Sequence, residues 1–120
     1  MQYMLLIYLD ENSLSESERA KCYADSAGYA RQLNTSRKYV AAAPLQPTLT
    51  ATSVRFRDGK RVVTDGPFAE TREQLGGFFI VNAANLDEAI EMAGQIPAGR
   101  WGTVEIRPIL EISGLPEKSE

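Results

Sequence analysis

The chain contains no histidine. Its absence excludes Ser-His-Asp and Cys-His nucleophilic arrangements, together with metal sites that depend on imidazole ligands. Any acid–base chemistry near neutral pH would therefore fall to an Asp, Glu, Tyr, Lys or Cys side chain.

Cysteine is almost as scarce. Cys22 is the single cysteine, so neither an intrachain disulfide nor a cluster of thiolate ligands can form. This usage is typical of a reducing compartment, and we expect the protein to be cytoplasmic. Cys22 falls in a helical pattern, where a half-buried structural thiol is the first interpretation. The alternative is a nucleophile, which would need a neighbouring base or cation to lower its pKa.

Long apolar runs are missing as well. No stretch approaches the ~20 apolar residues of a transmembrane helix, and the N-terminal residues do not resemble a signal peptide. We therefore expect no membrane partner. The net charge of −3 argues against nucleic acid, which needs a basic surface. With 120 residues, 43% of them hydrophobic, the chain is typical of one globular domain with a modest core.

The most distinctive stretch is residues 62–81. Asp65-Gly66-Pro67 breaks the chain sharply, because glycine permits a positive φ and proline fixes its own φ. A dense polar segment follows, before the apolar residues 78–81. Polar groups between a rigid turn and a core strand often line pockets. The polar side chains are Thr64, Asp65, Glu70, Thr71, Arg72, Glu73 and Gln74.

The first third of the chain predicts a strand and a helix. Residues 2–9 are nearly all apolar and predict a central strand buried on both faces. Residues 15–34 predict a helix, with Ser15 and Glu18 at the spacing of a capping box. Its apolar positions recur every three or four residues, and we expect this narrow stripe to face a sheet. The stripe consists of Ala20, Tyr23, Ala24, Ala27 and Ala30.

The middle of the chain predicts a second strand over residues 38–45 and then a hairpin. Residues 52–57 and 60–64 are its strands, and Asp58-Gly59 is a turn signal. Basic residues cluster on this hairpin. A solvated face is the first interpretation, and an anion-attracting rim beside a pocket is the second. The cluster consists of Arg55, Arg57, Lys60 and Arg61.

The last third predicts strand, helix and strand. Residues 76–82 form a core strand, where Gly76-Gly77 permits a bulge or a close backbone approach. Asn85 caps a helix over residues 86–95, and residues 103–112 form the final strand. The order β-α-β, hairpin, β-α-β predicts an α+β fold of the ferredoxin-like type. Because two helices cover one sheet face only, we expect a homodimer that buries the other.

Residues 65–77, Asp-Gly-Pro-Phe-Ala-Glu-Thr-Arg-Glu-Gln-Leu-Gly-Gly, resemble the signature of the YCII-related family in its DGPF-motif (DGPFAETKE) branch. Residues 3–8, 43–47, 86–89 and 102–108 support the resemblance. It covers about residues 1–112, which we take as the domain, and leaves 113–120 as a polar, frayed tail. The resemblance implies a dimeric α+β barrel in which two subunits pair sheet to sheet, with the hairpin as an insertion.

Family members usually have glycine where Arg37 stands, at the end of the first helix. Asn34 is the residue we expect to take the left-handed conformation here instead. Some members also carry histidines where this chain has Arg31, Asn34 and Gln46. If those histidines act chemically in relatives, this chain does something different or nothing catalytic.

Asp65 is the candidate catalytic residue. A carboxylate fixed by a turn between apolar strands can act as a general acid or base. The alternative is that Asp65 bonds backbone amides of its own turn, as Asp often does. We expect neither a cofactor nor a metal, since Asp65, Glu70 and Glu73 match no calcium loop.

Four further residues are candidates for substrate binding. Glu70 and Arg72 are expected to form an ion pair, either bordering the pocket or merely on the surface. Arg107 is a candidate to bind a substrate carboxylate, although pairing with Glu105 or Glu70 is the stronger expectation. Tyr8 could supply a hydroxyl to a cleft, with core packing as the default.

Three hypotheses for function follow. The first, implied by resemblance to muconolactone isomerases and a dehydrochlorinase, is a cofactor-independent enzyme acting on a small carbonyl, lactone or ring substrate. Asp65 would move a proton, and Arg72 or Arg107 would orient an anionic substrate. The second is a non-catalytic small-molecule-binding or regulatory module, since this branch resembles proteins linked to extracytoplasmic-function sigma factors. The third is a structural dimer without a ligand.

Overall fold

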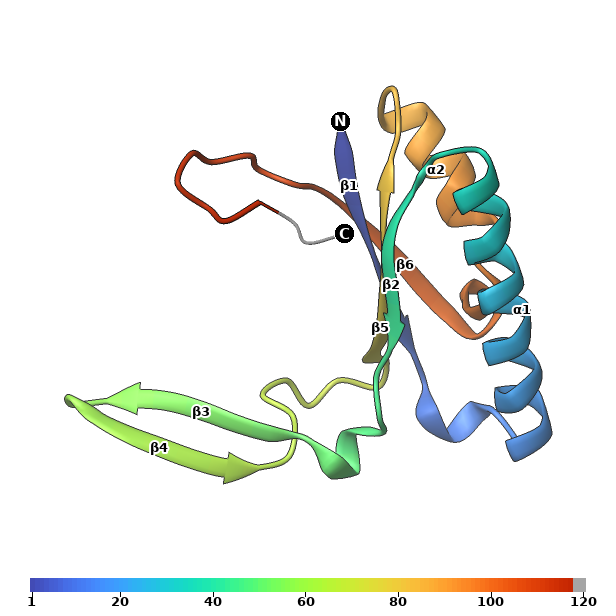
Figure 1. Ribbon diagram of the computed structural model, residues 1–120. Coiled ribbons are helices and arrows are strands. Elements are labelled where there is room, and N and C mark those ends of the chain that lie inside the picture. The colour runs from blue at the N-terminus through green and yellow to red at the C-terminus, as the bar shows by residue number, and fades with distance from the viewer. Residues whose placement is uncertain (118–120) are drawn as a thin grey trace.

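The structure is a computed structural model that describes residues 1–117, so the predicted tail lies partly outside the described residues. A four-stranded antiparallel sheet of order β2-β5-β1-β6 carries two helices on one face (Figure 1). This arrangement confirms the predicted α+β, ferredoxin-like fold. No helix within residues 1–117 is long and apolar enough to cross a membrane. The elements of this unit are β1 (Gln2–Leu9), α1 (Glu16–Thr35), β2 (Tyr39–Pro44), β5 (Gln74–Asn82), α2 (Leu86–Gly94) and β6 (Gly102–Pro108).

Burial alternates along β1, contrary to the prediction that both of its faces are buried. Tyr3, Leu5, Ile7 and Leu9 are buried beneath the helices, and the residues between them are only half-buried. The helices cover one face of the sheet, so the residues at even positions lie on the other face. We call this other side the open face. It includes Met4, Leu6 and Tyr8 of β1 with Phe78 and Ile80 of β5.

Helix α1 begins as predicted. The Ser15 hydroxyl accepts a hydrogen bond from the Glu18 amide at 3.1 Å, and the Glu18 carboxylate accepts one from the Ser15 amide at 2.9 Å. The buried face was predicted wrongly, because the helix turns Cys22, Tyr29 and Leu33 to the core. Burial stabilises in proportion to apolar area. Larger side chains therefore outweigh a stripe made mostly of alanines.

The end of α1 also differs from the prediction. Arg37 itself takes the left-handed conformation, with φ of 62°, and Asn34 remains within the helix. The amide of Lys38 donates to the carbonyl of Leu33 at 2.8 Å, which closes the helix end. This is the position where glycine is ordinarily favoured.

Strand β5 uses both glycines as predicted. Ile7 lies opposite Gly77, and Tyr8 lies opposite Leu75, so Gly76 forms a bulge. A Cβ on Gly77 would lie 2.8 Å from the carbonyl oxygen of Ala43, so the strands approach closely there.

The second helix and the final strand follow. The Asn85 side chain caps α2 by accepting the Glu88 amide at 3.0 Å. Strand β6 ends at Pro108, four residues earlier than predicted. Its partner β1 begins at Gln2, whose carbonyl takes the last bond, from the amide of Ile109 at 2.9 Å. Beyond this point β1 offers no further partner.

The hairpin of β3 (Thr52–Arg57) and β4 (Lys60–Asp65) forms a separate two-stranded sheet. Asp58 and Gly59 both have positive φ, as a tight two-residue hairpin turn requires. Figure 1 shows the hairpin and the segment after β6 extending on the side of the sheet opposite the helices. These two segments therefore flank the open face.

Candidate functional site

A cavity of about 440 Å³ lies between α1 and strands β2 and β5. Small residues leave this space open, since Ala27 and Ala30 of α1 lie across from Ala42 of β2 and the glycine pair of β5. Its walls are mostly apolar, and its volume suits a small organic molecule. Three members of the predicted stripe of α1, namely Tyr23, Ala27 and Ala30, thus border a cavity instead of closing the core.

One wall of the cavity carries the thiol of Cys22 and the hydroxyl of Ser26. Burial raises the pKa of the Cys22 thiol, and the charge of Asp25 adds to this effect. A hydrogen bond from Ser26 and the charge of Arg19 oppose it. The thiol is therefore protonated at neutral pH, which supports the structural interpretation of Cys22 over the nucleophilic one.

Arg31 is the one charged residue among the described residues that line this cavity. It comes from the exposed side of α1, where one guanidinium nitrogen lies 3.7 Å from the position of a Cβ on Gly28, and it also lines the groove between the two helices. Tyr23 and Tyr39 add hydroxyl groups to the same lining. The arrangement provides an apolar volume with a cation and several neutral donors.

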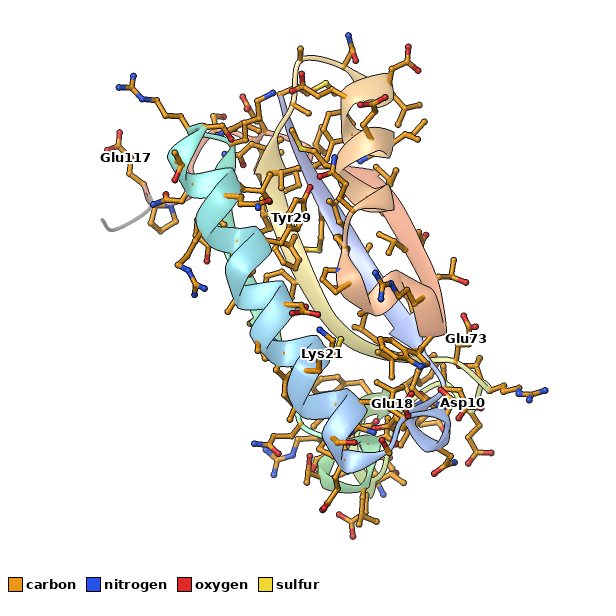
Figure 2. The ribbon with its side chains drawn as sticks, turned by 90° about the vertical axis from the view of Figure 1, so that its right-hand side faces the viewer. Asp10, Glu18, Lys21, Tyr29, Glu73 and Glu117 are labelled. Carbon is orange, nitrogen blue, oxygen red and sulfur yellow. The ribbon has the colours of Figure 1, made fainter. Side chains whose placement is uncertain are left out.

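Tyr29 lines an open groove of about 1010 Å³ between the two helices. Figure 2 shows Tyr29 pointing from α1 into the space between the helices. Its hydroxyl donates to the carbonyl of Met92 at 3.0 Å, and burial raises its pKa. Tyr29 is thus a structural link between α1 and α2.

The predicted site residues lie away from the cavity. Asp65 is exposed at the end of β4, and Glu70 is exposed in the segment that follows. Within residues 1–117 the Asp65 carboxylate bonds no amide of its own turn and has no ion-pair partner. The expected ion pair between Arg72 and Glu70 does not form. The Arg72 Nε lies 3.6 Å from the Asp10 carboxylate instead.

Tyr8 and Arg107 do share a surface, because both lie on the open face. Tyr8 is half-buried opposite Thr103, and Arg107 lies opposite Met4. The Arg107 guanidinium lies 3.7 Å from Glu105, so the expected pairing on the final strand is present. The structure does not bring Asp65 or Glu70 into contact with either residue within the described chain.

Sequence reasoning missed three features of this region. The Thr103 hydroxyl donates to the Glu73 carboxylate at 2.9 Å, at the edge where Figure 2 also shows Asp10. Glu11 binds the segment at Thr48, and Arg31 lines the cavity. Only the cavity had a signal in the sequence, namely small residues on three elements that pack against each other.

Among the described residues, no group of three His, Cys, Asp or Glu side chains could hold a metal ion.

Residues 1–113 match the model of the YCII-related domain, so the chain belongs to the YCII-related family. An uncharacterized protein of Rhizobium meliloti (strain 1021) is 36% identical over 114 residues, covering 91% of this chain and 92% of that protein. Membership of the DGPF branch stays a prediction based on residues 65–77.

A solved structure has the same fold. It is 5-chloro-2-hydroxyhydroquinone dehydrochlorinase (TftG) from Burkholderia phenoliruptrix AC1100, in complex with 2,5-dihydroxybenzoquinone. The match has a TM-score of 0.56 and 20% identity, and it covers 92% of this chain and 94% of that one. At this identity the likeness shows the fold alone.

Proposed function

We propose that this protein binds a small ring compound bearing an acidic or carbonyl oxygen in the cavity beneath α1. The ring packs against Ala30, Ala42 and Phe79, and the oxygen faces Arg31. The observation that carries this proposal is the composition of the cavity, an apolar volume of about 440 Å³ whose lining holds one cation.

Physical chemistry favours such a ligand over a strongly polar one. Apolar walls gain about 25 cal/mol for each Å² that a ring removes from water. A single guanidinium provides two parallel donors for a carboxylate or a similar pair of oxygens. The 2,5-dihydroxybenzoquinone in the dehydrochlorinase complex is itself a small ring with such oxygens, and it supports the same choice of ligand class.

Catalytic turnover of such a ligand is a separate question, because the predicted catalytic residue is Asp65. No carboxylate is among the described residues that line the cavity, so Asp65 cannot act there from its position on this hairpin. The acid–base role of Asp65, with Arg72 or Arg107 orienting an anion, therefore stays a prediction. So do a cytoplasmic location, the absence of a cofactor and a link to sigma factors.

Calorimetric titration with benzoate and 2,5-dihydroxybenzoquinone tests binding. Ala27→Leu fills the edge of the cavity, and Ala20→Leu is the matched control, because both alanines are exposed on α1 and Ala20 is not part of the lining. We expect Ala27→Leu alone to weaken binding at least tenfold. Equal affinity in both variants, or no binding by the wild type, would contradict the proposal.

The anion contact has its own test. Arg31→Gln should weaken binding of benzoate about tenfold but leave binding of the uncharged benzamide nearly unchanged. Lys21→Gln is the control, since Lys21 lies on α1 outside the lining and pairs with Asp25.

Asp65→Asn should leave the binding of both ligands intact. If it also keeps full turnover of a ligand that the wild type converts, the acid–base role of Asp65 is excluded.

A further inference from the structure

The groove of about 1010 Å³ between α1 and α2 takes part of its lining from the short 3₁₀ helix η3 (Pro97–Trp101). Helix η3 follows α2 in the chain and packs against α1. Figure 2 faces this side of the molecule, with α1 in blue to cyan and with α2 and η3 in pale orange. Among the described residues, Arg31 is the only one that lines both this groove and the cavity beneath α1. The two spaces therefore have separate linings except at one side chain.

Arg31 stands between the groove and the cavity because of its position on α1. Residues three and four apart are neighbours on the surface of a helix. Ala27, four residues before Arg31, lines the cavity, and Gly28, three residues before it, lines the groove. The Nη2 atom of Arg31 lies 3.7 Å from the position that a Cβ on Gly28 would take, so the side chain leans toward the groove. One guanidinium cannot bind an anion in both spaces at the same time.

The groove carries two positive charges that no residue within the described chain neutralises. Arg31 comes from α1 and Arg100 from η3, and within residues 1–117 neither guanidinium has a hydrogen-bond or ion-pair partner. Asp25 is the one acidic residue among the described residues of the lining, and its carboxylate pairs with the Lys21 ammonium at 3.1 Å. The lining therefore attracts anions.

The origin of the two guanidinium groups favours a phosphate-type anion over a carboxylate. Each guanidinium presents paired donors that bind two oxygens side by side. A planar carboxylate is satisfied by one such pair, whereas tetrahedral phosphate groups present oxygens in several directions and carry more charge. Two guanidinium groups that come from different elements therefore suit a group such as pyrophosphate.

We propose that the groove binds pyrophosphate or a similar polyphosphate group through Arg31 and Arg100, and that this binding withdraws Arg31 from the cavity. A polyanion in the groove then weakens the binding of an acidic ring compound in the cavity. The coupling is reciprocal, because each ligand must change the affinity of the other by the same factor. This regulation rests on the proposed function of the cavity, whereas the polyphosphate site itself does not.

Calorimetric titration with pyrophosphate at constant ionic strength tests the groove alone. Arg100→Gln should weaken pyrophosphate binding roughly tenfold or more, because it removes one pair of charged donors. Arg57→Gln is the matched control, since it removes the same charge from strand β3, outside the lining. Both side chains are exposed, and circular dichroism checks that both variants remain folded. Equal weakening in the two variants, or a wild type that does not bind at about 10 mM pyrophosphate, would overturn the proposal.

Titration of benzoate into protein saturated with pyrophosphate tests the shared residue. We expect benzoate to bind about tenfold more weakly than in potassium chloride of the same ionic strength, which matches the loss expected for Arg31→Gln. Binding of the uncharged benzamide should not change. Arg100→Gln keeps the cavity lining intact and should abolish the effect at the same pyrophosphate concentration. Undiminished benzoate affinity with pyrophosphate bound would show that the two ligands do not share Arg31 and would overturn the coupling.

The order of the titrations separates the groove from the cavity. Pyrophosphate binding is measured before any ring compound is added, so it does not depend on the cavity. Benzoate binding without pyrophosphate binding would support the cavity proposal and overturn the groove site. Pyrophosphate binding without benzoate binding would support the groove site, overturn the coupling and contradict the cavity proposal.

Discussion

Glu11 holds Thr48 by both of its carboxylate oxygens. One oxygen accepts the Thr48 amide at 2.9 Å, and the other accepts the Thr48 hydroxyl. Thr48 begins the short 3₁₀ helix Thr48–Thr50 that leads into the hairpin. Glu11, two residues past the end of β1, thus anchors the base of the segment that carries Asp65.

Removing this carboxylate should loosen the base of the hairpin. We expect Glu11→Ala to cost about 1.5–3 kcal/mol of local stability, the usual range for hydrogen bonds to a charged group. Hydrogen exchange should accelerate at the amides of Thr48, Thr50 and Ala51, while the amides of β1 and β5 stay protected. Glu11→Gln, which keeps one acceptor, should give an intermediate rate. Unchanged exchange at Thr48 would show that the contact does not anchor the segment.

Arg37→Gly should stabilise the protein. Arg37 has φ of 62°, a conformation that costs a residue with a side chain about 1–2 kcal/mol and that glycine adopts freely. Part of this gain is offset by the greater freedom of glycine in the unfolded chain. We expect a net gain of about 1 kcal/mol, which corresponds to a melting temperature higher by roughly 3–5 °C.

Ser36→Gly is the matched control for this substitution. Ser36 has φ of −88°, and its hydroxyl donates to the carbonyl of Gln32 at 3.1 Å. Glycine at this position gains nothing from its conformational freedom and loses that bond, so the melting temperature should fall. A lower melting temperature for Arg37→Gly as well would refute the strain at Arg37.

Several features were predictable because adjacent residues determine them. The capping box of Ser15 and Glu18 and the Asn85 cap each depend on residues three positions apart. The turn at Asp58-Gly59 depends on two adjacent residues that tolerate positive φ. Their local chemistry is present in the sequence, and the structure confirms each one.

Other features depend on what packs against them. The buried face of α1 is decided by Tyr29 and Leu33 meeting the sheet, which periodicity among alanines does not reveal. Strand β6 ends where β1 stops offering partners. The cavity arises from small residues on elements far apart in sequence, so it required the assembled layers. The role of Asp65 stays a prediction, because one chain leaves it exposed.

Acid should weaken the link between β2 and α2. The Lys38 ammonium lies 2.9 Å from the Glu88 carboxylate, and its hydrogen bond, with one from the Ala84 amide, lowers the pKa of Glu88. A carboxyl group whose pKa is lower in the folded chain than in the unfolded chain stabilises the folded state at pH values above its unfolded pKa, which is about 4.3. That contribution is lost as the pH falls through the lower folded value.

Urea unfolding between pH 2.5 and pH 6 measures this loss. Glu88→Gln and Lys38→Gln should each reduce the fall in stability below about pH 4, because each removes one side of the same pair. The double variant should show no further reduction. An acid limb identical to the wild type in both single variants would mean that the pair contributes nothing measurable.

Cys22 should resist alkylation in the folded protein. Its side chain is 6% exposed, and burial raises the pKa of its thiol, so both access and the thiolate form are restricted. With iodoacetamide at pH 7.5 we expect a rate below roughly 1% of the rate in denaturant, measured by intact mass. A ligand that fills the cavity should slow the reaction further, since Cys22 is part of the lining. A rate close to that of the denatured chain would instead mean that the thiol is exposed and that α1 does not hold the cavity closed.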